Sequence, residues 1–254
     1  SGSLSEMTKS LYNRIEAIES FAADVAHELK NPLTSLRSAV ETWPLAKSDE
    51  SRARLLDVIQ HDVRRLDRLI SDISNASRLD AELARADAEK VDLALLAEAV
   101  TGVVNSITRE NHVSVKLNIE RSANAKSPFI VTGHDSRLGQ VLTNVIENAC
   151  SFSPTGGEVR VSLGRIGPDI EIVIEDYGPG IPAHALEKVF QRFYTDRPEQ
   201  GFGQNSGLGL SISRQIIAAH HGRIWAENIY AQSPHEPDAM PIGARFIIRL
   251  SATP

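Results

Sequence analysis

The organisation of this chain follows from one segment, Phe21-Ala-Ala-Asp-Val-Ala-His-Glu-Leu-Lys-Asn-Pro-Leu-Thr-Ser-Leu36. At about 100° of turn per residue, the apolar side chains in and around this segment fall within an arc of roughly 80°. The residues of this apolar stripe are Ile18, Ala22, Val25, Leu29, Leu33, Leu36 and Val40. The pattern predicts an amphipathic helix that buries the stripe.

His27 lies about 160° from the centre of the stripe, so its imidazole is expected on the outward face. That face also carries Asp24, Asn31, Thr34 and Ser38. A single His in such a place is most often a solvated polar residue. Here Glu28 follows directly and could accept an imidazole proton. Pro32 removes the backbone hydrogen bond to the Glu28 carbonyl and predicts a bend one turn past His27, so the neighbours favour a reactive site.

The predicted helix is long, because apolar residues keep a three-four spacing from Leu4 to Val40. Trp43-Pro44 ends it, the polar residues 47–51 favour a turn, and a second run of the same spacing follows. The apolar residues of this second run are Leu56, Ile59, Val63, Leu66, Ile70 and Ile73. The pattern predicts a helical hairpin. Two stripes of this length cannot bury each other completely, so we expect two chains to form a homodimer through a four-helix bundle.

The composition is that of a globular protein: 254 residues, 41% hydrophobic and 24% charged, are enough for two domains with their own cores. A net charge of -6 disfavours nucleic acid or an anionic membrane as the main partner. The apolar runs are too short to span a bilayer and no secretory signal is present, so we expect a soluble chain. The single cysteine, Cys150, fits a core position in a reducing cytosol.

After Leu83 the periodicity loosens, and the small, charged residues 84–90 are typical of a linker. Helical and alternating patterns then follow one another, which predicts an α/β sandwich with helices on one face of a mixed sheet. The expected divisions are a helical hairpin at 1–85, a linker at 86–92 and a second domain at 93–254. The expected helices are at about 93–108, 136–152 and 207–221, and the expected strands are at 113–119, 129–132, 158–165, 169–175, 223–227 and 244–250.

Two glycine clusters stand beside these elements. In Asp176-Tyr-Gly178-Pro-Gly180-Ile181, a carboxylate at a strand end precedes glycines that admit close backbone approach, and it would suit an adenine amino group. A plain strand-to-loop turn explains this first cluster equally well. The second cluster, Ser206-Gly207-Leu208-Gly209-Leu210, opens the expected helix at 207, where free N–H groups and the helix dipole suit phosphates. It is neither a Walker A loop nor a Rossmann fingerprint.

Asn144 and Asn148 lie four residues apart in the expected helix 136–152, so both amides project from one face. Two amides so placed could hold a hydrated Mg²⁺ and its phosphates through oxygen ligands. The alternative is a pair of capping or solvated asparagines, which the two glycine clusters make less favoured.

Together these motifs resemble those of the cytoplasmic catalytic core of bacterial two-component sensor histidine kinases, and the resemblance covers nearly the whole chain. Five boxes occur in the right order, which is a very specific pattern. Residues 21–33 match the H box, 144–149 the N box, 176–181 the first glycine box, 189–194 the F box and 207–210 the second glycine box. With residues 12–20 before it, the H-box helix also resembles alphaproteobacterial ChvG/BvrS-type envelope sensors.

The resemblance implies a HisKA-type dimerisation and phosphotransfer bundle, followed by an ATP-binding domain of the GHKL (Bergerat) type. It implies ATP-dependent phosphorylation of His27 and transfer of the phosphoryl group to an aspartate of a response regulator. Glu28 matches the general base, and Asn31 matches the residue that orients a water for dephosphorylating that partner.

By the same matching, Asp176 binds the adenine amino group and Asn148 binds Mg²⁺. The phosphates lie at the second glycine box, and residues 183–206 form a mobile lid. The other nucleotide-binding positions implied are Asn144, Gly178, Gly180, Ile181, Phe193, Ser206, Gly207, Leu208, Gly209 and Leu210.

Position 144 is discriminating, because related ATPases that hydrolyse ATP with water have glutamate there, and Asn144 therefore disfavours hydrolysis. Ser151, Thr195 and Asn205 depart from the family pattern, so that fewer cations would face the triphosphate. Either Arg192 or Arg197 could compensate. These departures motivate an alternative function, a degenerate kinase that acts as a dimeric docking or phosphatase scaffold with weak nucleotide binding.

The outward face of His27 continues through Thr34, Ser38 and Glu41, so a receiver domain that reaches His27 is expected to cover them. The resemblance further implies a full-length protein anchored at the cytoplasmic face of the inner membrane. This fragment is expected to make no membrane contact of its own.

Overall fold

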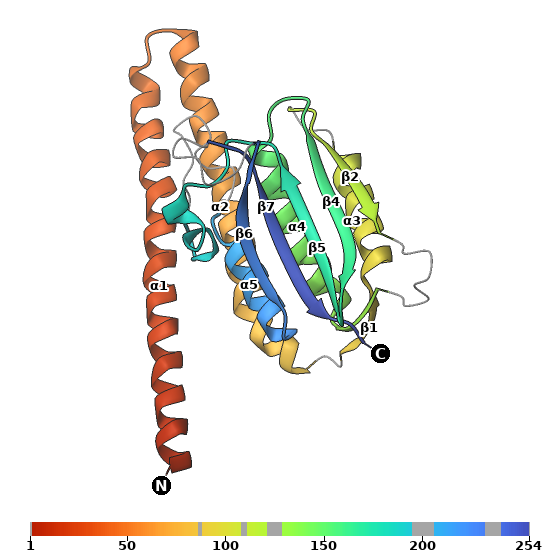
Figure 1. The fold of residues 1–254 in the computed structure, drawn as a ribbon. Coiled ribbons are helices and arrows are strands. Elements are labelled where there is room, and N and C mark those ends of the chain that lie inside the picture. Colours follow the sequence, from red (N-terminus) through yellow and green to blue (C-terminus); the bar gives the residue numbers. More distant parts are fainter. Residues whose placement is uncertain are drawn as a thin grey trace. The chain divides into compact units, whose positions relative to one another are not determined.

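The computed structural model describes residues 2–85, 88–107, 111–120, 129–194, 206–231 and 240–253 (Figure 1). The chain forms two compact units. The first comprises residues 1–77 with 195–206, and the second comprises residues 78–194 with 207–254.

The first unit is built on a helical hairpin, as the three-four spacing predicts. Helix α1 runs over Gly2–Thr42 and continues through Pro32. The short 3-10 helix Trp43–Leu45 follows, and helix α2 spans Asp49–Arg85. The connection is shorter than the expected turn, because the Ser51 N–H donates to the Ser48 hydroxyl oxygen at 3.1 Å and starts α2 early.

Within one chain the apolar stripe of α1 is only partly covered. Val25, Leu29 and Leu36 are half-buried. Ile18, Leu33 and Val40, by contrast, are 59%, 53% and 58% exposed. On α2, the exposed apolar residues include Leu56, Val63 and Ile70, whereas Leu69 is fully buried. The prediction of a buried stripe therefore holds for only part of it in a single hairpin.

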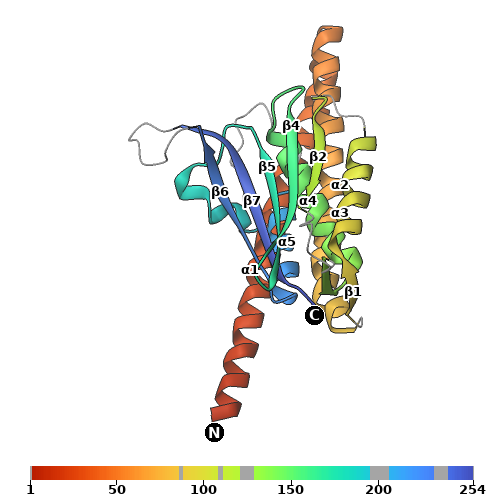
Figure 2. The same ribbon diagram turned by 45° about the vertical axis from the view of Figure 1, so that its right-hand side comes forward.

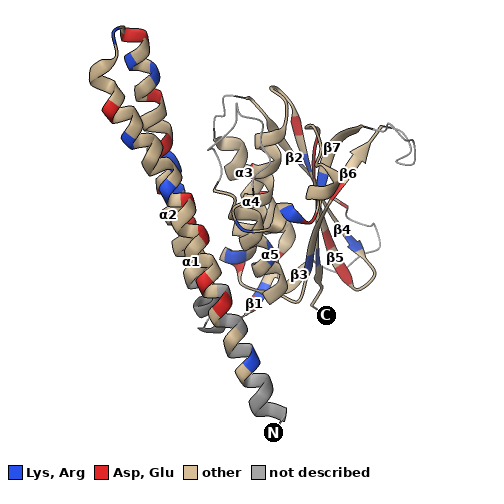
Figure 3. Cartoon of the chain, turned by 90° about the vertical axis from the view of Figure 1, so that its left-hand side faces the viewer, with Lys and Arg blue, Asp and Glu red and all other residues tan. Residues whose placement is uncertain are grey.

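Charged residues of both signs alternate along the two hairpin helices (Figure 3). Several of them pair one turn apart, such as Arg54 with Glu50 at 2.6 Å and Arg37 with Glu41 at 3.8 Å. Exposed pairs of this kind contribute only a few tenths of a kcal/mol each, about 0.3–0.5. None of the described helices is long and apolar enough to cross a membrane.

The second unit confirms the predicted α/β sandwich. Its main sheet is mixed, with the order β2-β4-β5-β7-β6, and only the β2–β4 pair is parallel. The strands are β2 (Ser114–Ile119), β4 (Glu158–Ile166), β5 (Asp169–Asp176), β6 (Arg223–Tyr230) and β7 (Pro241–Ser251). Helices α3 (Leu93–Ser106), α4 (Asp135–Phe152) and α5 (Gly209–Ala219) lie on one face of this sheet (Figure 2).

The core lies between this sheet and the helices. Every second residue of β5 is buried, beginning with Ile170, Ile172 and Ile174. Helix α4 packs against the sheet and against α5. It contributes the buried side chains Leu138, Val141, Leu142, Val145, Ile146, Ala149 and Cys150. Cys150 is thus a buried free cysteine, in agreement with its predicted core position.

Two sequence-based boundaries are wrong. Part of the predicted linker, Glu89–Asp92, forms strand β1, which pairs antiparallel with β3 (Ile130–Gly133). Periodicity missed it because the strand has four residues and one buried side chain. Helix α5 begins at Gly209 and not at 207, because Gly207 has φ of +74°, outside the right-handed helical region.

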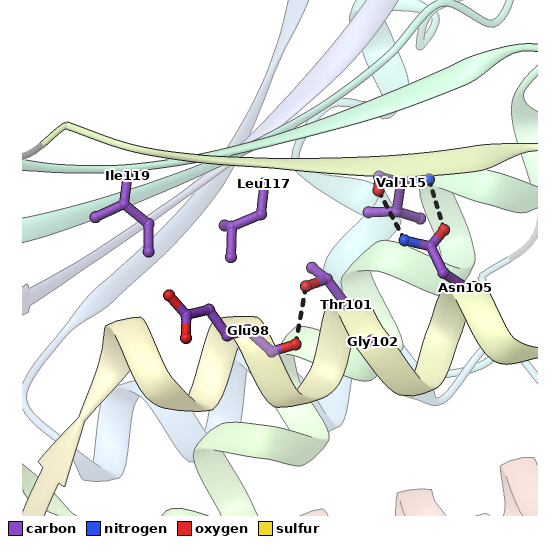
Figure 4. Close-up of a pocket in the computed structure, with 7 residues that line it drawn as sticks. All are labelled: Glu98, Thr101, Gly102, Asn105, Val115, Leu117 and Ile119. Atoms are coloured by element: carbon purple, nitrogen blue, oxygen red, sulfur yellow. Dashed lines mark hydrogen bonds between the residues drawn. The ribbon is translucent and has the colours of Figure 1, made fainter.

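An open pocket lies between α3 and the edge strand β2 (Figure 4). Its wall is held by Asn105, whose Nδ2 donates to the Val115 carbonyl at 2.8 Å while its Oδ1 accepts from the Val115 N–H at 2.9 Å. The amide thus pairs with the open edge as a neighbouring strand would. The pocket is lined by Glu98, Thr101, Gly102, Asn105, Val115, Leu117 and Ile119, none of which is a predicted site residue.

Candidate functional site

Asp176 continues the buried side of β5, so that its carboxyl group is placed on the helix-facing side of the sheet at the strand's end. It is 3% exposed. Its Oδ1 accepts from the Gly178 N–H at 2.9 Å and from the Ala244 N–H at 3.4 Å. Burial raises the pKa of this carboxyl, and the two N–H bonds oppose that rise. Oδ2 accepts no hydrogen bond from any residue that the structure describes.

The loop after Asp176 is held from two sides. A Cβ at Gly178 would lie 2.5 Å from the carbonyl oxygen of Phe152, the last residue of α4. Gly180 has φ of +76°, a conformation that favours glycine. Asn228 on β6 then fixes Ile181: its Oδ1 accepts from the Ile181 N–H at 2.8 Å and its Nδ2 donates to the Ile181 carbonyl at 2.7 Å. The first glycine cluster is therefore packed against the end of α4 and hydrogen-bonded to β6.

The second glycine cluster meets the F box through the backbone. The Phe193 N–H donates to the Gly207 carbonyl at 2.9 Å, and Phe193 itself has φ of +59°. A Cβ at Gly207 would lie 2.8 Å from the Phe193 Cα, so only glycine fits this crossing. Leu208 is buried, and Gly209 and Leu210 begin α5. The N-terminus of α5 is thus anchored beside the end of the F box.

The two asparagines of α4 have different surroundings. Asn144 Nδ2 donates to the Gly209 carbonyl at 3.1 Å and reaches Ser213 Oγ at 3.5 Å, which ties α4 to the first turn of α5. Neither bond engages the Asn144 side-chain oxygen, so the role of Asn144 in nucleotide binding stays a prediction. Asn148 is half-buried, and its amide has no hydrogen-bond partner among the described residues.

The Asn148 amide, which has no partner among the described residues, fits a Mg²⁺ ion. Its side-chain oxygen is a hard ligand of the kind that Mg²⁺ prefers, and the ion commonly takes its remaining ligands from phosphates and water. Among the described residues, no group of three or more His, Cys, Asp and Glu side chains is placed to hold a metal. A metal here would depend on the nucleotide for most of its ligands.

Four predicted boxes thus meet in the second unit, at one end of α4, β5 and α5. Ser151 donates to the Asn148 carbonyl at 2.6 Å, and Arg192 is half-buried. Ser206 is different: it groups with the first unit, where its hydroxyl donates to Asp72. Burial raises the pKa of the Asp72 carboxyl, against the effect of that hydrogen bond. Thr195, Arg197 and Asn205 lie outside the described residues, as do all residues from 195 to 205 of the predicted lid 183–206.

Sequence reasoning missed the supports that come from β6 and β7. Besides Asn228 and the Ala244 N–H, these include Gly243, where a Cβ would overlap the Asp176 carbonyl oxygen. Strands β7 and β5 pair as far as Ala244, which lies opposite Asp176, so the backbones of the two strands approach closely at that point. A glycine within a strand is the one available signal of such an approach.

We expect Gly243→Ala to disturb the fold and the Asp176 loop together. The added methyl group meets backbone and not a movable side chain, so the loss of unfolding free energy should be about 2–3 kcal/mol, near the upper end for overpacking. Gly102→Ala is the matched control, since no heavy atom lies within 4 Å of its Cβ and alanine favours a helix. Thermal unfolding measures both. An unchanged Gly243→Ala melting temperature would contradict the close crossing.

In the first unit, His27 is exposed on α1, as periodicity predicts, and makes no hydrogen bond or ion pair with the described residues. Asn31, one turn on, is exposed as well. Glu28 is half-buried, and its Oε2 pairs with Arg65 Nη2 on α2 at 2.9 Å. The predicted general base thus has a partner of its own, which sequence reasoning did not find.

Two family models match these units. The His Kinase A (phospho-acceptor) domain matches residues 17–82, and the histidine kinase-, DNA gyrase B- and HSP90-like ATPase matches residues 133–254. The solved chain of the mycobacterial sensor histidine kinase MprB is 33% identical, with a TM-score of 0.53, and the match covers 66% of this chain and 99% of that solved chain. This chain belongs to the sensor histidine kinases. It carries their phospho-acceptor module and their ATPase module in that order.

Curated relatives in this kinase family are closer in sequence. The sensor protein ChvG of Rhizobium meliloti is 57% identical over 99% of this chain, and ChvG of Agrobacterium fabrum is 56% identical over 98%. The chain spans 43% and 41% of their respective lengths. The resemblance to ChvG-type sensors is thus confirmed.

A further solved kinase supports the two-domain fold. The histidine kinase ThkA, crystallised in complex with the response regulator protein TrrA, matches 95% of this chain with a TM-score of 0.69. At 23% identity, this likeness bears on the fold alone. It confirms a helical hairpin followed by an α/β sandwich.

Proposed function

We propose that this kinase core phosphorylates His27 from ATP and hands the phosphoryl group to an aspartate of a response-regulator receiver domain. The observation that carries the proposal is the exposed His27 imidazole, without a partner among the described residues, in a chain whose nucleotide domain has Asn144 where a water-activating glutamate would stand. A nucleotide site of that kind needs a nucleophile other than water, and His27 supplies one.

The nucleotide would be held by polar groups around the two glycine clusters. Asp176 Oδ2 would accept from the adenine amino group, because Oδ1 is already engaged by two backbone N–H groups. The backbone N–H groups at the start of α5 would receive the phosphates. Asn148 would hold Mg²⁺, which when bound supplies charge neutralisation on the phosphate oxygens.

The chemistry at His27 is an in-line displacement. Glu28 takes the proton from Nδ1, and Nε2 attacks the γ-phosphorus as the bond from that phosphorus to the ADP oxygen breaks. Asn31 lies one turn further along the same helix, where it would orient a water for dephosphorylating the partner. Asn31 is on the exposed side of α1, and the half-buried Glu28 lies next to that side.

A homodimer is the state that the hairpin favours. Ile18, Leu33 and Val40 on α1 and Val63 and Ile70 on α2 leave an apolar surface uncovered in one chain. A second hairpin with the same surface would bury it in a four-helix bundle.

The helix face that carries His27 is where we place the contact with a receiver domain. Thr34, Ser38 and Glu41 are exposed about two to four turns beyond His27, so a receiver domain reaching His27 would cover them. The resemblance to ChvG-type sensors implies anchoring of the whole protein at the cytoplasmic face of the inner membrane.

Incubation with γ-labelled ATP and Mg²⁺ tests the proposal: we expect acid-labile, alkali-stable phosphate on the protein, with little free phosphate released. Calorimetric titration with a non-hydrolysable ATP analogue separates the alternative, since micromolar, Mg²⁺-dependent binding is expected of a kinase. Weak binding without phosphohistidine would instead indicate a docking or phosphatase scaffold. Multiple-turnover ADP release without phosphohistidine would indicate a plain ATPase.

A further inference from the structure

The carboxylate of Glu28, which follows His27 on α1, is held by a residue of α2. Glu28 Oε2 lies 2.9 Å from Arg65 Nη2, and the side chains of Glu28 and Arg65 are 24% and 20% exposed. Residues 28 and 65 are 37 positions apart, so the pair joins α1 to α2 and does not stabilise either helix locally. His27 faces outward and takes no part in it.

The hydrogen bonding of Arg65 in this pair is incomplete. Only Nη2 reaches the Glu28 carboxylate, so the bidentate geometry that makes Arg–carboxylate pairs strong is absent. Arg65 Nε is buried without a partner, and so is Oδ2 of Asp62, one turn earlier on α2. Opening this pair breaks one hydrogen bond and not the two of a bidentate Arg–carboxylate pair.

We propose, on the basis of the function proposed above, that Arg65 is a positioning residue that holds the Glu28 carboxylate against α2 and away from the His27 imidazole. The pair draws the Glu28 carboxylate toward Arg65 on α2, whereas the His27 imidazole faces outward from α1. The carboxylate therefore has to leave Arg65 before it can reach the imidazole Nδ1. When the pair opens, Glu28 becomes available to take the Nδ1 proton, and Nε2 becomes the nucleophile.

The sharpest test is Arg65→Met, which keeps much of the aliphatic volume and removes the charge. We expect autophosphorylation to rise about three- to tenfold in kcat, with the KM for ATP unchanged, because only the opening step is removed. Arg65→Lys can still pair with Glu28 and should stay near the wild-type rate. Arg64→Met removes the neighbouring exposed charge and serves as the matched control.

A double variant shows whether Arg65 acts through Glu28. In the Glu28→Gln background, Arg65→Met should cause no further acceleration, since the base it would release is gone. An acceleration of the same size in that background would overturn the proposal, as would an unchanged or lower kcat in Arg65→Met alone. Should Arg65→Met fail to fold by circular dichroism, Arg65→Gln takes its place.

A second measurement does not depend on ATP. Diethyl pyrocarbonate modifies neutral imidazole, and at pH 8 an ordinary histidine is neutral. Mass spectrometry of the peptide that contains His27 should show faster modification in Arg65→Met than in wild type, and no acceleration in the Glu28→Gln background. Absence of phosphohistidine in the wild type would refute the proposed function while this reaction still decides the role of Arg65. Equal modification rates in Arg65→Met and wild type would overturn the positioning role of Arg65.

Discussion

Replacing His27 by glutamine is expected to abolish acid-labile, alkali-stable phosphorylation and to leave nucleotide binding unchanged. Glutamine is polar and helix-compatible, but its amide has no nucleophilic nitrogen. His27 is exposed and has no partner among the described residues, so the unfolding free energy should change by no more than about 0.5 kcal/mol. Labelled ATP measures the phosphorylation, and calorimetry with an ATP analogue measures the binding.

Undiminished phosphate in His27→Gln would refute His27 as the acceptor. Glu28→Gln is the companion variant, for which slower phosphorylation with intact ATP binding is expected. Mixing His27→Gln with Asn148→Ala adds the geometry of the reaction. The first chain keeps its nucleotide site and the second keeps its histidine, so labelling of the mixture occurs only if one protomer phosphorylates the other.

Asp176→Asn is expected to weaken nucleotide binding by about 10- to 150-fold without destabilising the domain. Asparagine can keep the bonds from the Gly178 and Ala244 N–H groups through its oxygen. Its NH₂ group then stands where Oδ2 stood and donates, so it opposes the adenine amino group. The affinity loss corresponds to one hydrogen bond to a charged group, about 1.5–3 kcal/mol.

The stability expectation follows from the raised pKa of Asp176. A carboxyl whose pKa is higher in the folded than in the unfolded state favours folding fully below the unfolded pKa, and this contribution is lost as the pH rises through the folded pKa. At neutral pH the buried charge is therefore a cost, which asparagine removes. The melting temperature of Asp176→Asn should equal or exceed that of the wild type.

The same pKa direction predicts how binding depends on pH. Affinity for the ATP analogue should fall as the pH falls through the raised pKa of Asp176, at a higher pH than for an exposed aspartate. Asp169→Asn, at the opposite end of β5, is the matched control and should leave affinity unchanged. A large loss of affinity in Asp169→Asn, or none in Asp176→Asn, would contradict the assignment of adenine to this carboxylate.

How far each part of the site was predictable depends on the distance over which its determinants act. The outward position of His27 follows from the helical period, and the buried position of Asp176 follows from the strand period of β5. The two glycine clusters predict close backbone approach from their composition alone. The hydrogen bond from Asn144 to the Gly209 carbonyl could not be predicted in the same way, because the two residues are 65 positions apart in the sequence.

The sequence by itself determined the hairpin, the α/β class, the order of the motifs and the faces on which His27 and Asp176 lie, because these depend on periods of 3.6 and 2 residues within single elements. Only the tertiary structure decided which groups surround them. Arg65 on Glu28, Asn228 on Ile181 and Gly243 beneath Asp176 join segments that are 37 to 67 residues apart, and such contacts arise from packing and strand register, which leave no local pattern. The reactive groups could therefore be predicted from the sequence, whereas the contacts that hold them could not.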